Sequence, residues 1–92
     1  MGAQPVIKMV SEEKIKRLFW HSRRGMLELD LILLPFLEKH FRQLGDEDQK
    51  LYEQLLTSED QDMFRWFLRN ETPGDPQIAH IVDIILAHHK PN

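Results

Sequence analysis

The segment from Leu29 to Phe41 constrains the fold most, because it is the most apolar stretch of the 92-residue chain. Its apolar side chains recur at intervals of three and four residues, which is the spacing of one helix face: Leu29, Ile32, Leu33, Phe36, Leu37 and Phe41. Further leucines lie on the flanks, and a helix that is apolar nearly all round is usually surrounded by other elements. We therefore expect a central helix that begins near Met26 or Leu27 and ends at Leu44.

Pro35 interrupts this segment. Inside a helix a proline removes one hydrogen bond and clashes with the preceding turn, at a cost of about 3 kcal/mol. The apolar spacing continues through Pro35, so the sequence favours one kinked helix over two helices that meet there.

Four other segments have helical spacing and are separated by turn residues. Each has a candidate N-cap: Ser11, Asp46 with Gln49, Ser58 with Gln61, and Asp75 before Pro76. Asp60 is an alternative N-cap to Ser58. No segment alternates with period two for long enough to form a strand. We predict an all-α fold, a compact bundle of about five short helices in a single domain, with a flexible N-terminal arm over 1–10 and the bundle over 11–90.

Charge is distributed unevenly along the chain, whose net charge is -3. Residues 8–24 contain six basic and two acidic residues, a local charge of +4, and residues 25–92 contain six basic and thirteen acidic residues, a local charge of -7. A basic end on an acidic body suggests an oriented encounter with an acidic surface. The simpler interpretation is a solvated first helix.

Several functional classes lack the residues they need. The chain has no cysteine and no glycine-rich phosphate loop, and its five histidines lack the spacing of a metal site. No apolar run approaches the ~20 residues of a membrane span, and no signal peptide is recognisable. We therefore predict no enzyme activity, no catalytic residue, no metal, no membrane insertion, a cytoplasmic location and a monomer when free.

A short motif joins the basic first helix to the central one. Arg23 and Arg24 are followed by Gly25, and a carboxylate follows at Glu28. On one interpretation the motif is structural: Arg24 complements the end of one helix, Gly25 takes a left-handed conformation, and Glu28 complements the start of the next helix. On the other it is an exposed recognition surface, because Arg is frequent among residues that anchor interfaces. Trp20 lies one turn earlier and could share that surface with Arg24.

Around this motif the chain resembles a known family. Trp20, the run Arg23-Arg24-Gly25-Met26-Leu27-Glu28-Leu29-Asp30, Pro35-Phe36 and Met63-Phe64 with Trp66 are similar to the small bacterial succinate dehydrogenase flavinylation factors, also called FAD assembly factors. The resemblance extends from about Ile15 to Leu86. The absence of a long leader favours a bacterial member over a mitochondrial one.

The resemblance implies an assembly factor that binds the flavoprotein subunit of succinate dehydrogenase, and of fumarate reductase, and promotes covalent attachment of FAD to it. FAD would be bound by that partner, so no cofactor is expected on this chain. The predicted partner-binding residues are Trp20, Arg23, Arg24, Gly25, Glu28 and Asp30. The alternative function is a small nucleic-acid-binding or toxin–antitoxin regulatory protein that uses the basic first helix, although the acidic remainder argues against nucleic acid.

Overall fold

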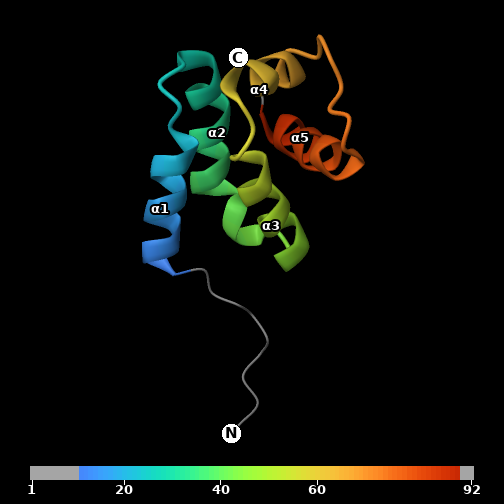
Figure 1. Ribbon diagram of the computed structural model, residues 1–92. Helices are drawn as coiled ribbons and strands as arrows, with labels where there is room; N and C mark the ends of the chain where they lie inside the picture. Colours follow the sequence, from blue (N-terminus) through green and yellow to red (C-terminus); the bar gives the residue numbers. More distant parts are fainter. Residues whose placement is uncertain (1–10, 90–92) are drawn as a thin grey trace, which may run out of the picture.

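The structure, a computed structural model, describes residues 11–89 (Figure 1). It contains α1 (Glu12–Ser22), α2 (Leu27–Lys39), the 3-10 turn η1 (Phe41–Gln43), α3 (Asp46–Leu55), α4 (Asp60–Phe67) and α5 (Pro76–His88). No strand occurs in this part of the chain, so the predicted all-α class is confirmed. The predicted arm over 1–10 lies outside the described residues, as does residue 90.

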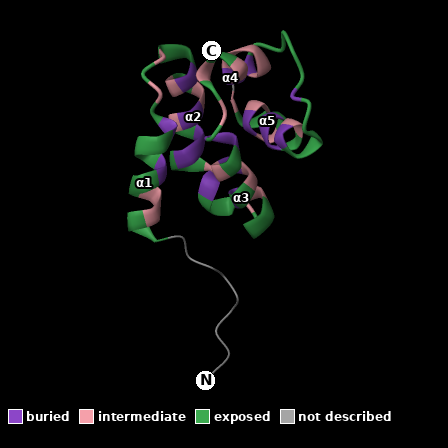
Figure 2. Ribbon diagram, in the orientation of Figure 1, coloured by how far each residue is buried: buried purple, intermediate pink, exposed green. Residues whose placement is uncertain are grey.

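Helix α2 lies at the centre of the bundle, as its apolar pattern predicts. It contacts α1, α4, α5 and η1, and α3 packs against α5. Leu29, Leu33, Phe36 and Leu37 are its buried residues, and Figure 2 shows the buried surface concentrated where the helices face one another. Burial of one such side chain stabilises the fold by about 1.5–3 kcal/mol, so α2 anchors the remaining helices.

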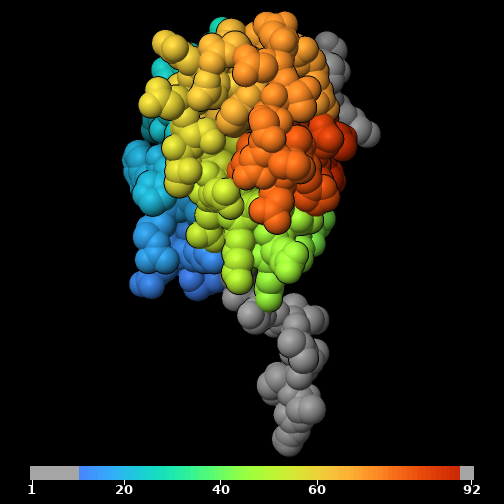
Figure 3. All heavy atoms as spheres, turned by 45° about the vertical axis from the view of Figure 1, so that its right-hand side comes forward, coloured from blue at the N-terminus to red at the C-terminus, as the bar shows by residue number. Residues whose placement is uncertain are grey.

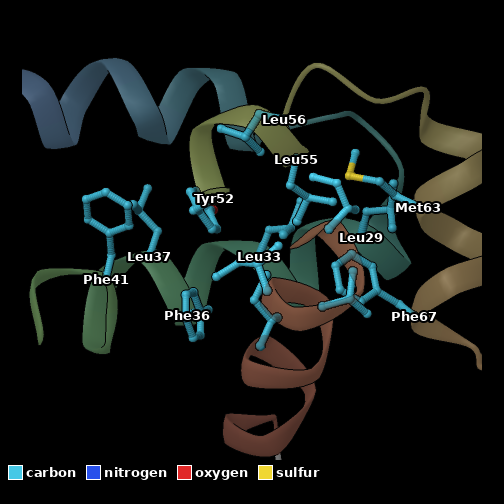
Figure 4. Packing of buried hydrophobic residues seen from close by; sticks show 14 of the residues in the cluster. Leu29, Leu33, Phe36, Leu37, Phe41, Tyr52, Leu55, Leu56, Met63 and Phe67 are labelled. Carbon is cyan, nitrogen blue, oxygen red and sulfur yellow. The ribbon is translucent and has the colours of Figure 1, made fainter. Parts of the chain in front are cut away.

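The core is formed where α2 meets the later helices. Figure 4 shows side chains of α2 directed toward Tyr52 and Leu55 of α3 and toward Met63 and Phe67 of α4, all of which are buried. Helix α5 adds four apolar side chains to the same cluster: Ile78, Ile81, Val82 and Ile85. In the space-filling view of Figure 3, α3, α4 and α5 form one continuous face.

A buried polar contact fixes the C-terminal end of α1. The Ser22 Oγ and Tyr52 Oη atoms are 2.7 Å apart, and both residues are 0% exposed. Burial raises the pKa of the Tyr52 phenol, so this group stays protonated and can donate to Ser22. The contact joins α1 to α3 directly beside the motif that follows Ser22.

Helix α2 continues through Pro35 as a single helix but ends earlier than predicted. Its last residue is Lys39, and η1 replaces the expected continuation to Leu44. The Gln49 side-chain nitrogen donates to the carbonyl oxygens of Phe41 and Leu44, at 3.3 and 3.2 Å. The Phe41 oxygen also accepts from the backbone nitrogen of Leu44 at 3.0 Å, so the Gln49 side chain ties both ends of η1 to α3.

Two of the predicted N-caps are confirmed and two are wrong. Ser11 Oγ accepts from the backbone nitrogen of Lys14, and Asp75 Oδ1 accepts from that of Gln77. For α3 the N-cap is Gly45 and Asp46 is already helical, and the Gln49 side chain donates to Phe41 and Leu44 instead of the cap. For α4 the N-cap is Glu59, and no side chain caps this helix.

None of the helices within residues 11–89 has the length and apolarity needed to cross a membrane.

Candidate functional site

The site is the corner between α1 and α2, residues 23–26, together with the adjoining turns of both helices. Helix α1 ends at Ser22, so Arg23 is its C-cap and Arg24 lies one residue beyond the cap. Gly25 has a φ of +80°, which is the left-handed conformation expected of it. A side chain at this position would be strained by the backbone conformation, although a Cβ would meet no atom within 4 Å.

The Arg24 side chain is largely buried and is bound within the protein. Its Nε lies 2.8 Å from Asp60 Oδ1, and its Nη2 lies 2.8 Å from the carbonyl oxygen of Ser58. Its Nη1 donates to the carbonyl oxygen of His21 at 2.7 Å, as expected for a cation that complements a helix end. The Arg24 guanidinium therefore links the end of α1 to the α3–α4 connection.

The backbone of Arg24 is held as well as its side chain. Its nitrogen donates to Asp30 Oδ1 at 2.8 Å, so Asp30 ties the corner to the first turns of α2. With only 15% of the Arg24 side chain exposed, its guanidinium is bound within this chain, and its contact with a partner stays a prediction. The part that reaches the surface lines a shallow hollow of about 420 Å³ with residues 57–61.

Arg23, rather than Arg24, shares a surface with Trp20. The Arg23 Cζ atom is 6.0 Å from the centroid of the Trp20 ring, a cation–π distance that contributes about 0.5–1 kcal/mol at an exposed site. Phe19 meets the same indole edge-on, with ring centroids 5.8 Å apart. Trp20 is nevertheless 65% exposed. Because α1 ends at Ser22, Arg23 lies beside Trp20 and the Arg24 side chain turns inward.

The first turn of α2 adds exposed groups on the other side of the corner. Glu28 is exposed, and Leu27 is 67% exposed although it is apolar. Among the described residues Glu28 makes no side-chain hydrogen bond or ion pair, so its carboxylate is available to another molecule. Of the exposed groups on this corner, the aromatic ring and the arginine are of the kinds that are enriched at protein interfaces.

The predicted site residues fall into two groups, which differ in exposure. Trp20, Arg23 and Glu28 are exposed, whereas Arg24 and Asp30 hold the corner in shape. The sequence analysis missed Asp60 and Ser58, which complete the Arg24 site. Both were considered only as helix caps, and no local signal connects them to a residue more than thirty positions away.

Within residues 11–89 no group of three or more His, Cys, Asp or Glu is placed to hold a metal ion.

Comparisons with known proteins identify the family of this small helical protein. The model of the family described as flavinator of succinate dehydrogenase matches residues 16–89. The FAD assembly factor SdhE of Pseudomonas putida is 48% identical over 83 residues, which cover 90% of this chain and 99% of that protein.

Other relatives carry the same name. The FAD assembly factor SdhE of Pseudomonas aeruginosa is 46% identical over 84 residues, 91% of this chain and 100% of that protein. The one from Photobacterium profundum is 44% identical over 80 residues, 87% of this chain and 91% of that protein. These relatives are named as assembly factors and not as enzymes. On the strength of a match over most of its length, the chain belongs to the family of succinate dehydrogenase flavinators.

Proposed function

We propose that this protein binds the flavoprotein subunit of succinate dehydrogenase, and that of fumarate reductase, in the cytoplasm and promotes covalent attachment of FAD to a histidine of that subunit. The observation that carries the proposal is the α1–α2 corner. It presents Trp20, Arg23, Leu27 and Glu28 to solvent on a backbone that Arg24 fixes from inside. Family membership supports this choice of partner.

The residues of the corner divide into contact groups and holding groups. The Trp20–Arg23 pair offers a large aromatic surface next to a cation, which is the composition of frequent interface hot spots. Glu28 offers an anion to a partner cation. Arg24, Gly25 and Asp30 act indirectly, because they fix the backbone that carries the contact groups.

The mechanism consists of positioning. Docking of the corner near the flavin domain biases the partner toward a conformation in which its histidine and the flavin are aligned. Alignment of reacting groups can lower a barrier by several kcal/mol, up to about 7–11 kcal/mol in the best intramolecular cases. FAD is held by the flavoprotein throughout, and the bond to it forms within that partner.

The alternative use of the basic first helix in nucleic-acid binding has less support. Arg24 is directed inward onto Asp60, and Lys14 Nζ lies 2.9 Å from Glu53 Oε2. Two of the cations that would track phosphates are therefore already paired with carboxylates of the same chain. This leaves no observation that favours a nucleic acid over an acidic protein surface.

The test is a reconstituted flavinylation reaction. Purified flavoprotein subunit lacking FAD is mixed with FAD and with the wild-type protein or a variant, and covalent flavin is read by in-gel fluorescence. Trp20→Ala, Arg23→Ala and Glu28→Ala should each slow the appearance of covalent flavin while their thermal stability stays near that of the wild type. Lys50→Ala, on the exposed side of α3, is the matched control. Wild-type rates in all three corner variants would overturn the proposal.

A further inference from the structure

A groove of about 710 Å³ lies between the C-terminal half of α2 and the end of α5, away from the corner. We refer to it as the α2–α5 groove. Leu31, Phe36 and Ile85 form part of its apolar lining. Leu31 is 57% exposed, so a large aliphatic side chain is available there to a second molecule.

The ionisable side chains that line the groove are all bases: Lys39, His40, His88 and His89. No carboxylate is among its lining residues, although the chain as a whole has a net charge of -3. An apolar floor beside a basic rim complements a segment that combines an apolar side chain with carboxylates.

Three rings give the rim a defined geometry. The His40 and His88 ring centroids are 4.2 Å apart, and each lies 5.8 Å from the centroid of Phe36. His88 Nδ1 is 3.0 Å from the carbonyl oxygen of Ile84, which can only accept, so Nδ1 carries the proton. This bond fixes the orientation of the His88 ring at the end of α5.

A metal ion is a poor occupant for this histidine pair. Over residues 11–89 no three His, Cys, Asp or Glu side chains converge in a way that could hold a metal. Two imidazoles supply only two ligands, whereas a zinc ion in a protein has about four.

An exposed apolar stripe on α2 leads from the corner to the groove. Leu27, Leu31 and Pro35 recur every four residues and are all exposed, which places them on one side of the helix. Leu27 adjoins Glu28 at the corner, and Leu31 and Pro35 line the groove. At 1.5 Å per residue this apolar stripe spans about 12 Å, so a partner docked at the corner can also reach the groove.

We propose that the α2–α5 groove docks an acidic segment of the same flavoprotein subunit, with one apolar side chain of that segment against Leu31 and Phe36. Carboxylates of the segment pair with Lys39 and with the protonated ring of His40. The proposal rests on the proposed function and adds a second contact to it, distinct from the corner.

Protonation of the rim gives the contact a pH dependence. In the free protein, burial and the neighbouring charges of His88 and Lys39 lower the pKa of His40. A carboxylate bound in the groove stabilises the protonated imidazole, so the His40 pKa is higher in the complex than in the free protein. Binding then takes up a proton, and affinity rises as the pH falls through the histidine range.

Site-specific photo-crosslinking locates the contact, because the chain contains no cysteine. Ala87→Cys places a single thiol in the groove, Leu27→Cys places one at the corner, and Glu13→Cys places one at the far end of α1 as a control. Each is labelled with a thiol-reactive photo-crosslinker and irradiated with purified flavoprotein subunit, and the joined peptides are identified by mass spectrometry. The expected result is an acidic, apolar flavoprotein peptide at Ala87→Cys, a different flavoprotein peptide at Leu27→Cys, and neither at Glu13→Cys.

The other outcomes separate the two proposals. A crosslink at Leu27→Cys without one at Ala87→Cys would overturn the groove contact and leave the corner intact. No flavoprotein crosslink at either position would overturn both proposals. A crosslink from Ala87→Cys to a second copy of this chain would assign the groove to self-association and overturn docking of the flavoprotein there.

Affinity measurements test the charge of the rim. Lys39→Glu combined with His88→Glu should weaken binding of the flavoprotein subunit by about tenfold or more. His40→Gln should abolish the rise in affinity between about pH 8 and about pH 6. Lys50→Glu on α3 is the matched charge control. Unchanged affinity in the double charge reversal would overturn the proposal.

Discussion

Replacement of Arg24 by alanine should destabilise the whole domain, although this residue lies in a corner that resembles a recognition surface. The change removes an ion pair to Asp60 and two hydrogen bonds to the backbone carbonyls of Ser58 and His21. It also removes packing of the Arg24 stem, whose side chain is only 15% exposed.

The magnitude follows from the burial of the two partners. Breaking a fully buried ion pair costs about 3–5 kcal/mol, because the remaining charge is left without a partner. Asp60 is 38% exposed and can be rehydrated by water, which reduces that cost. With the two carbonyl contacts included, we expect Arg24→Ala to lower the free energy of unfolding by about 3 kcal/mol.

Thermal unfolding followed by far-ultraviolet circular dichroism measures this loss. For a domain of this size, 3 kcal/mol corresponds to a fall in Tm of roughly 12–24 °C. Arg23→Ala is the control, since this neighbouring arginine is exposed and should lose no more than the cation–π contact with Trp20, about 1 kcal/mol at most. Asp60→Ala combined with Arg24→Ala should destabilise by less than the sum of the two single changes, because the two residues share one interaction.

A small effect would refute the reasoning. If Arg24→Ala unfolds within about 0.5 kcal/mol of the wild type, the guanidinium does not hold the corner in solution and is available to a partner. Equal effects of Arg23→Ala and Arg24→Ala would likewise contradict the division between contact groups and holding groups.

Three further changes test other parts of the structure. Gly25→Ala should cost about 1 kcal/mol in chemical denaturation, from the positive φ alone, because a Cβ there meets no neighbour; a loss above about 3 kcal/mol would show that the corner is more crowded than this. Tyr52→Phe should cost about 1–2 kcal/mol in the same assay, because it leaves the buried Ser22 hydroxyl without its partner, and an unchanged midpoint would contradict that contact. Phe41→Ala should cost about 3–5 kcal/mol in thermal unfolding, since the ring is fully buried; an unchanged Tm would place this residue outside the core.

The parts of the fold that could be predicted are those specified by neighbouring residues. The apolar period of α2 depends on residues three and four apart, and Asp75 before Pro76 marks the start of α5 within two positions. Gly25 and its left-handed conformation belong to the same class. Such signals lie within one or two helical turns, so a short stretch of sequence is enough to predict these features.

The role of Arg24 could not be predicted, because its partners lie far along the chain. Asp60 and Ser58 are 36 and 34 residues away and meet Arg24 only after α3 and α4 have packed. The exact end of α1 also decides which arginine points outward. With the helix ending at Ser22, Arg23 meets Trp20 and Arg24 turns inward, which no helix-end pattern of two adjacent arginines specifies.

The same limit explains the wrong assignments at Gln49 and Asp60. Both residues have the spacing of helix N-terminal capping signals, but each has a stronger long-range use. Gln49 donates to the carbonyl oxygens of Phe41 and Leu44 at the two ends of η1, and Asp60 accepts from Arg24. A capping pattern is therefore a local prediction that a buried tertiary contact can override.

The most direct test of the central claim is the affinity of the purified flavoprotein subunit for three versions of this protein, measured by titration calorimetry: wild type, Arg23→Ala with Glu28→Ala, and Lys50→Ala. If the exposed corner is the contact surface, the corner variant should bind at least about 2 kcal/mol more weakly, with a Tm close to that of the wild type and with Lys50→Ala unchanged. Equal affinity of all three versions would contradict the claim and would leave the corner as a structural joint between α1 and α2.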